Sequence, residues 1–449
     1  MRETSPLSIN AGYGSAAGGQ ARVRRRATRQ RVSPAVIFLA LFTFVVVGRT
    51  VEIFPSLHLA FIFGGVTGLL ALQLPRSGRP GLLKSSEVRA VIGLLGLAAL
   101  TIPFSLWPGG SLSHVLNAHV KMVIFFLLLV HCVRSLHDVN VTVWGFLGSI
   151  AVIELWVLLF NQKARAQVSY MYDPNDLAFV MVCAIPLAAS LAVHGRGIAR
   201  YLAGLIVSAG VAVVVLTTSR AGFVGIVLVG LVILARLWHR RPLFTAALLL
   251  VTLVVFASVA SESYWGRVGT IWGGGKAAGP GAEYDREGLK AARLEIWKTG
   301  LRMTLEHPIL GVGAGVFVVA EAATHGGRGR WEAPHNSFLQ VAGELGLGGL
   351  ALFVFLLYAA VRICRTVIRR AKRDPQLRSY LWLAEGLEVS LYGFVIMGFT
   401  LHQAYSPILY FLLGMSVALK RLTAWESVPE RDAPSPTSRP APIARSAQP

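Results

Sequence analysis

The sequence has little charge and few cysteines. Charged residues make up 14% of the 449 residues, against about 25% in an ordinary soluble domain. Hydrophobic residues make up 54%, so the composition excludes a soluble globular enzyme. The three cysteines, Cys132, Cys183 and Cys364, lie in or at the end of hydrophobic runs and have no CxxC spacing. We therefore expect neither a disulfide framework nor a zinc site.

The hydrophobic residues are gathered into long runs, each close to the ~20 residues that a helix needs to cross a bilayer. They predict an all-α polytopic membrane protein with about twelve transmembrane helices. The runs lie near residues 34–48, 56–74, 88–106, 115–133, 141–160, 176–193, 201–217, 222–238, 243–260, 337–361, 380–400 and 406–419.

Lysine and arginine are concentrated in alternate loops, and this bias predicts the orientation of the helices. Both termini are expected in the cytoplasm, with one large loop on the periplasmic face. The predicted organisation is a basic disordered tail (1–33), nine spans (34–260), a periplasmic loop with short helices (261–334), three spans (335–421) and a second disordered tail (422–449). Because the excess of 43 basic over 22 acidic residues lies between hydrophobic runs, it indicates anionic membrane lipid and not nucleic acid as a partner.

Polar residues within spans are costly, and here they gather in the outer half once the helices are oriented. Each has a structural alternative: a lysine can reach the headgroups, an arginine can anchor a span at the boundary, and Asp, Asn or His can cap a helix. Those alternatives do not explain why the polar residues share one leaflet. The residues are Lys121, Glu154, Asp173, Asn175, Asp176, Arg220, His335, Asn336, Glu344, His402 and Gln403.

The tenth predicted span begins with a polar stripe. Asn336, Gln340 and Glu344 recur at i, i+4 and i+8 and so share one helix face. Several glycines follow between residues 343 and 349, which allow close helix packing. We expect this stripe to face the interior of the bundle.

The long loop contains a segment with helical periodicity, residues 286–307. Leu294, Trp297, Leu301 and Leu305 form a hydrophobic stripe, and a basic edge runs from Arg286 through Lys290 and Arg293. This pattern predicts a helix on the membrane surface, and contact with headgroups alone would also explain it. The glycine-rich stretch 308–315 has the wrong spacing for a dinucleotide loop, so we expect a close-packed turn.

The order of these motifs resembles the bacterial O-antigen ligase and O-antigen polymerase family. The likeness is carried by Pro334-His335-Asn336 followed by Glu344-Leu345-Gly346-Leu347-Gly348-Gly349, by Asp173-Pro174-Asn175-Asp176, by Ser219-Arg220-Ala221-Gly222 and by Arg293-x-x-x-Trp297. It implies a glycosyltransferase of the bacterial inner membrane. Such an enzyme passes a glycan from an undecaprenyl-pyrophosphate carrier to a glycan, lipid or protein acceptor, without a cofactor or metal ion.

The residues support an inverting transfer. Departure of the glycan leaves extra negative charge on the pyrophosphate, and the sequence has no Asp-x-Asp motif to bring a metal ion to it. Arg220 and Arg293 can bind phosphate oxygens at two points, and His335 is the best available base for the acceptor hydroxyl. Glu344 is a second candidate base or a supporting group. We assign substrate binding to Lys121, Asp173, Asn175, Asp176, Lys290, Trp297, Asn336 and Gln340.

Two other functions fit twelve spans. A solute transporter needs polar groups through both leaflets, so the clustering in one half disfavours it, although Glu385 and Glu388 in the eleventh span are not explained by glycan transfer. A scaffold for envelope-polysaccharide assembly would make no use of the histidine and arginines. The sequence identifies neither the sugar nor the acceptor, and it does not separate ligation from polymerisation.

Overall fold

A computed structural model describes residues 32–49, 55–75, 81–161, 165–168, 172–269, 284–324 and 331–426. The two tails predicted to be disordered lie almost entirely outside these ranges. The last helix, α17 (Pro407–Glu426), continues five residues past the predicted end of the final span at residue 421.

The chain is an all-α polytopic membrane protein, as predicted, and a helix covers each of the twelve hydrophobic runs. Within the described residues, ten helical segments are long and hydrophobic enough to cross a membrane. They are α4 (Ser86–Thr101) with the turn that follows it, α5 (Pro108–His114) continuing into α6 (Val120–Cys132), α7 (Leu136–Phe160), α8 (Pro174–His194), α9 (Ile198–Leu216), α10 (Arg220–Leu237), α11 (Pro242–Val259), α15 (Ser337–Arg373), α16 (Leu381–Gly398) and α17.

The first two runs form shorter helices than expected. Both α1 (Pro34–Val47) and α3 (Leu59–Leu72) have 14 residues, about 21 Å at 1.5 Å per residue, which is less than the ~30 Å hydrocarbon core. Helix α1 ends at Gly48, and α3 begins after His58, whose φ of 44° is left-handed. The left-handed backbone of His58 is not helical, so α3 begins only at the next residue.

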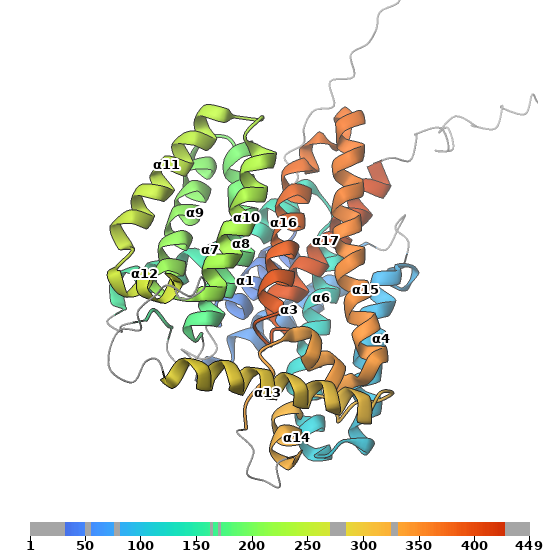
Figure 1. The fold of residues 1–449 in the computed structure, drawn as a ribbon. Coiled ribbons are helices and arrows are strands. Elements are labelled where there is room, and N and C mark those ends of the chain that lie inside the picture. The colour runs from blue at the N-terminus through green and yellow to red at the C-terminus, as the bar shows by residue number, and fades with distance from the viewer. Residues whose placement is uncertain are drawn as a thin grey trace, which may run out of the picture.

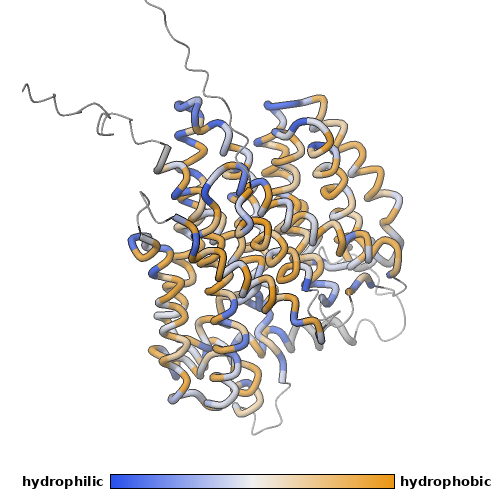
Figure 2. Tube along the Cα trace, turned by 180° about the vertical axis from the view of Figure 1, so that it is seen from behind, coloured by the Kyte–Doolittle hydropathy of each residue, from blue (hydrophilic) through white to orange (hydrophobic). Residues whose placement is uncertain are grey.

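Helix α8 is the centre of the bundle. It is buried along nearly its whole length, whereas α11 at the periphery exposes most of its surface. Helices α9, α10 and α16 pack around α8, and Figure 1 shows α16 between α10 and α15. In Figure 2 hydrophobic residues fill the middle of the bundle and hydrophilic residues gather toward its two ends. The bundle therefore has the profile of a membrane domain.

Helix α13 (Tyr284–Glu306) lies across one end of the bundle, which we call the α13 end (Figure 1). The helix predicted over residues 286–307 is thus confirmed. Its hydrophobic stripe is exposed, with Leu305 71% accessible, while Ile296 and Met303 on another face pack against Phe317 of α14 (Phe317–Thr324). The loop also contains α12 (Glu262–Gly269).

Helix α15 is not one continuous helix, contrary to expectation. It breaks at Gly346, where φ is 68° and ψ is −171°. The glycine-rich turn at 308–315 pairs with the break: Val312 N donates to Gly343 O at 2.8 Å, and Leu347 N donates to Pro308 O at 2.8 Å. The backbone groups released by the break are thereby satisfied.

Candidate active site

Three arginines from distant parts of the sequence line one cavity of about 170 Å³ at the α13 end. Arg165 comes from the loop before α8, Arg220 from the first residue of α10, and Arg293 from α13. Asn175, Thr218, Ala221 and Thr400 complete the lining. Since none of these described lining residues is acidic, this arginine cavity is suited to an anion.

Arg220 is positioned by the tight turn between α9 and α10. Ser219 caps α10: its Oγ accepts a hydrogen bond from Gly222 N at 3.2 Å and donates one to Asn175 Oδ1 at 2.9 Å. Arg220 therefore stands at the N-terminus of an 18-residue helix. Free N–H groups and the helix dipole make such a terminus favourable for an anion.

Arg165 was not predicted as a site residue. Its Nε donates to Thr217 O and to Thr218 Oγ1, both at 3.1 Å, so it is fixed to the same turn that carries Arg220. The sequence offered one indication that Arg165 belongs to the site: it is one of the few basic residues in the short loops expected on the outside.

Helix α13 connects the arginine cavity to His335. Arg293 lines the cavity, and one turn later Trp297 Nε1 donates to Pro334 O at 3.0 Å. This bond holds the segment directly before His335. Trp297, predicted to bind substrate, is thus in a position to orient the candidate base.

His335 has a left-handed backbone, with φ of 44°, and its Nδ1 is buried without a hydrogen-bond partner among the described residues. Its ring lies 5.5 Å from the ring of His402, centroid to centroid. Burial, followed by the charges of His402 and Arg293, lowers the pKa of His335 to about 4, while Asp173 opposes the shift. The imidazole is therefore neutral at pH 7 and has a free lone pair for a proton, but the lowered pKa makes it a weaker base than an ordinary histidine.

The segment Asp173–Asp176 joins the elements around the cavity. Asp173 caps α8 by accepting hydrogen bonds from Asn175 N at 2.6 Å and Asp176 N at 2.8 Å. Asp176 Oδ1 accepts one from Gln403 Nε2 at 2.7 Å, and Asn175 contacts Ser219 as described. His402 and Gln403, in the loop between α16 and α17, belong to the polar cluster that the sequence predicts for the outer half, but they were given no site role.

Asn336 has a capping role. Its Oδ1 accepts hydrogen bonds from Phe338 N at 2.9 Å and Leu339 N at 3.0 Å. The same oxygen cannot be fully available to a substrate. Its assignment to substrate binding stays a prediction.

Glu344 and Gln340 lie outside the lining of the arginine cavity. Glu344 Oε2 accepts a hydrogen bond from Tyr405 Oη at 2.9 Å, and the Tyr405 ring lies 4.1 Å from that of the buried His119. Gln340 is also buried. The polar stripe does face the interior, and this placement favours the supporting role for Glu344 over that of a base.

Two further predicted site residues are Lys121, which is not among the described residues that line the cavity, and Lys290. Lys121 Nζ lies 4.8 Å from the centroid of the Phe61 ring on α3, a contact that matches the structural alternative. Lys290 belongs to α13, but its side chain lies outside the described residues.

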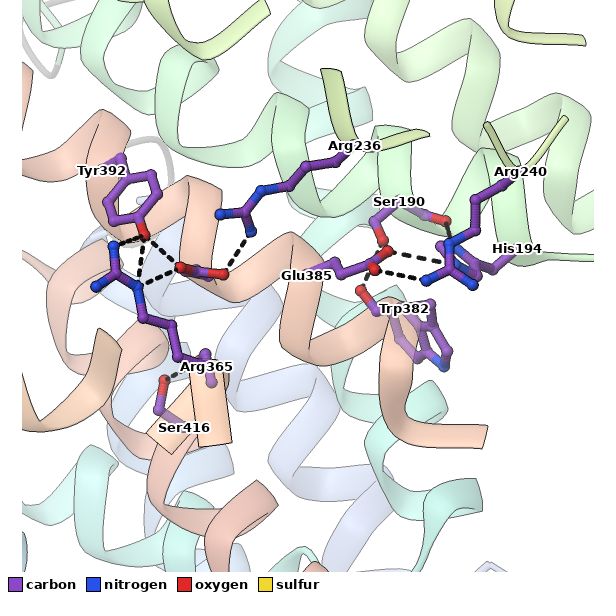
Figure 3. A network of polar contacts seen from close by, with 11 residues as sticks. Ser190, His194, Arg236, Arg240, Arg365, Trp382, Glu385, Tyr392 and Ser416 are labelled. Atoms are coloured by element: carbon purple, nitrogen blue, oxygen red, sulfur yellow. Dashed lines mark hydrogen bonds and ion pairs between the residues drawn. The ribbon is translucent and has the colours of Figure 1, made fainter. Parts of the chain in front are cut away.

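Glu385 and Glu388, which the sequence left unexplained, form ion pairs with arginines at the end of α10 opposite Arg220. Figure 3 shows this network from close by. Arg240 Nη2 donates to Glu385 Oε1 at 2.9 Å. Glu388 binds Arg236 and Tyr392, and Arg365 Nε donates to it at 2.8 Å. These carboxylates are neutralised by fixed arginines and do not extend the polar cluster at the α13 end.

Comparison with known families agrees with this geometry. Residues 203–354 match the family model for O-antigen ligase. The match covers 152 of the 449 residues, and over this segment the chain is similar to O-antigen ligases. No curated protein matches the chain. The matched segment contains Arg220, Arg293, His335 and Glu344, whereas Arg165, Asp173 and His402 lie outside it. The match and the hydrophobic helices together support a membrane glycosyltransferase-like function.

Proposed function

We propose that the protein transfers a glycan from an undecaprenyl-pyrophosphate carrier to an acceptor hydroxyl at the periplasmic face of the bacterial inner membrane. The observation that carries this proposal is the cavity lined by Arg165, Arg220 and Arg293 beside a neutral His335. Guanidinium groups bind phosphate oxygens at two points. The α13 end is then the periplasmic end.

The chemical step needs both parts of the site. The acceptor oxygen attacks the anomeric carbon, and its proton passes to His335. The bond between the anomeric carbon and the diphosphate oxygen breaks, and its electron pair leaves with the carrier diphosphate. Arg220 and Arg293 stabilise the charge that develops there, an effect that is strongest for preorganised groups.

Direct attack inverts the anomeric centre and requires no covalent sugar intermediate. The arginines supply the positive charge at the leaving group, so we propose a reaction that does not depend on a metal ion. The cavity of about 170 Å³ is small for a glycan, which we therefore place outside it, with the diphosphate inside.

The test is a transfer assay with purified protein, a labelled carrier-linked glycan and an acceptor. We expect Arg220→Ala and Arg293→Ala each to lower kcat about 10²–10³-fold, by analogy with removal of a single preorganised stabilising group. Arg220→Lys should also be impaired because lysine offers a point charge and no two-point contact. His335→Ala should lose about 10²–10⁴-fold.

Arg302→Ala is the matched control for Arg293→Ala. Arg302 is on the same helix, 72% of its side chain is exposed, and it pairs with Glu306. We expect it to retain wild-type transfer. If Arg220→Ala or His335→Ala transfers glycan at the wild-type rate, the role assigned to that residue is wrong. Transfer in detergent, without two compartments, would also exclude the transporter alternative as the whole function.

A further inference from the structure

A second, larger cavity lies at the end of the bundle away from α13. Its volume is about 940 Å³, and residues of α10, α15 and α16 line it together with His239 and Arg240, which follow α10. Helix α16 packs against both α10 and α15 and so forms the back wall. We call it the basic cavity, because six lysines and arginines line it against two glutamates.

Half of these basic residues are held by the two glutamates. Arg240 pairs with Glu385, and Arg236 and Arg365 both pair with Glu388 (Figure 3). The Glu388 side chain is only 1% exposed, so these arginines are anchored in the wall. The two glutamates thus hold three arginines in fixed positions, and the six basic residues of the lining still outnumber them.

The other three basic residues carry the surplus charge. Arg362, Arg369 and Lys372 lie on the same face of α15 as Arg365, with spacings of three or four residues. All three are exposed, and none forms an ion pair with a described residue. The basic cavity therefore offers unneutralised cationic groups next to fixed ones.

The cavity also has a hydrophobic part. Tyr358, Val361 and Ile368 on α15 contribute to its lining, and Tyr358 is 61% exposed. From Leu347, α15 reaches the ~30 Å thickness of a hydrocarbon core after about 20 residues, near Val367. The basic residues thus lie where headgroups begin, and the hydrophobic residues extend toward the acyl chains.

We propose that the basic cavity binds a phosphate-bearing anion, namely the headgroup of an anionic phospholipid in the leaflet opposite the arginine cavity. Basic pockets between transmembrane helices are suited to such headgroups. A soluble phosphate compound would offer the same anion without acyl chains. The hydrophobic lining favours the lipid. This proposal does not depend on glycan transfer, since the two cavities lie at opposite ends of the bundle.

The test measures binding of phosphatidylglycerol to the full-length protein in detergent by native mass spectrometry. Phosphatidylcholine with the same acyl chains is the neutral-lipid control, and inorganic pyrophosphate is the soluble probe. The variant is Arg369→Gln with Lys372→Gln. The matched control is Arg373→Gln with Arg378→Gln, which removes two nearby positive charges that do not line the cavity.

We expect phosphatidylglycerol to bind more tightly than phosphatidylcholine. The cavity variant should bind phosphatidylglycerol about thirtyfold more weakly, because each basic residue contributes about 1 kcal/mol to attraction of an anionic lipid. The control variant should bind like the wild type. An unchanged elution volume and thermal midpoint without lipid would confirm that the cavity variant is folded.

Two results would overturn the proposal. In one, the cavity variant binds both phosphate probes as the wild type does. In the other, both double variants lose the same affinity, which would mean that general charge and not the cavity attracts the lipid. Tight binding of pyrophosphate that is lost only in the cavity variant would support the phosphate site and reassign its source to a soluble compound.

Discussion

At the residue scale, His335 has a backbone held in an unusual conformation. Its left-handed φ of 44° is uncommon for a residue with a side chain and is maintained only where the surroundings impose it. Those surroundings are the Trp297 bond to Pro334 and the cap at Asn336. The backbone of His335 is thus held on both sides in the sequence.

The lowered pKa of His335 predicts the pH dependence of transfer. Because the protonated imidazole cannot accept the acceptor's proton, kcat/KM should be level between pH 7 and about pH 5 and fall about tenfold per unit below pH 4. In kcat the fall should begin at higher pH, because a bound diphosphate favours the charged imidazolium. The measurement is the pH profile of initial transfer rates.

Asp173→Asn provides a matched variant for that profile. Asparagine caps a helix about as well as aspartate, so α8 keeps its cap, while the negative charge that raises the pKa of His335 is removed. We expect the acidic limb of kcat/KM to move to lower pH. An acidic limb near pH 6.5 in the wild type would contradict the predicted environment of the imidazole.

Sequence reasoning found part of the site for clear physical reasons. Arg220, Arg293 and Asn175 were predicted from motifs and do line one cavity. Lys121, predicted with them, does not line that cavity, because a sequence gives the depth of a residue along a helix but not which neighbour its face meets. Its assignment to substrate binding stays a prediction. Arg165 lies in a loop, where no periodicity marks a residue as facing a site.

At the element scale, the break in α15 determines where Glu344 and the turn at 308–315 meet. The glycines between residues 343 and 349 were interpreted as a packing seam. Glycine occurs both where two helices pack closely and where a helix breaks, so the sequence alone does not separate these two cases. The break is recognised from the backbone of Pro308 and Ile309, which lies directly against Gly346. These residues are more than thirty positions away in the sequence.

Gly346→Ala should therefore destabilise the protein strongly. A Cβ at this position would lie 2.6 Å from the carbonyl oxygens of Pro308 and Ile309, and the backbone conformation is one that is essentially restricted to glycine. We expect the free energy of unfolding to fall by about 3 kcal/mol or more. Denaturation of the purified protein in detergent measures it.

Gly348→Ala is the control for that substitution. Its Cβ would meet only a side-chain atom of Leu97 at 3.8 Å, and alanine favours a helix over glycine. Its stability should equal or exceed that of the wild type. Equal stability of both variants would mean that the break at residue 346 does not require glycine.

At the scale of the whole molecule, the fold class followed from the sequence because hydrophobic runs of span length have few alternative structures. Helix α13 was also predicted, since its periodicity is local. The placement of α8 at the centre was not, because packing order depends on contacts between segments that are far apart in the sequence.

The orientation of the bundle is testable with cysteine labelling. The three native cysteines are buried, so an added one dominates the signal. In spheroplasts, a membrane-impermeant maleimide should label Arg302→Cys on α13 and should label Arg373→Cys at the end of α15 only after permeabilisation. The reverse pattern would place the arginine cavity in the cytoplasm and refute the proposed periplasmic reaction.

Helix α10 has an arginine of one cavity at its first residue and an arginine of the other in its last turn. Arg236 follows Arg220 by 16 positions, which corresponds to about 24 Å along the helix axis. The ion pair between Arg236 and Glu388 holds one end of α10. Because the helix is rigid, this pair also limits the position of Arg220 at the other end of α10. Because a mismatch in bilayer thickness tilts transmembrane helices, the thickness of the surrounding membrane would change the position of the Arg220 guanidinium in the arginine cavity.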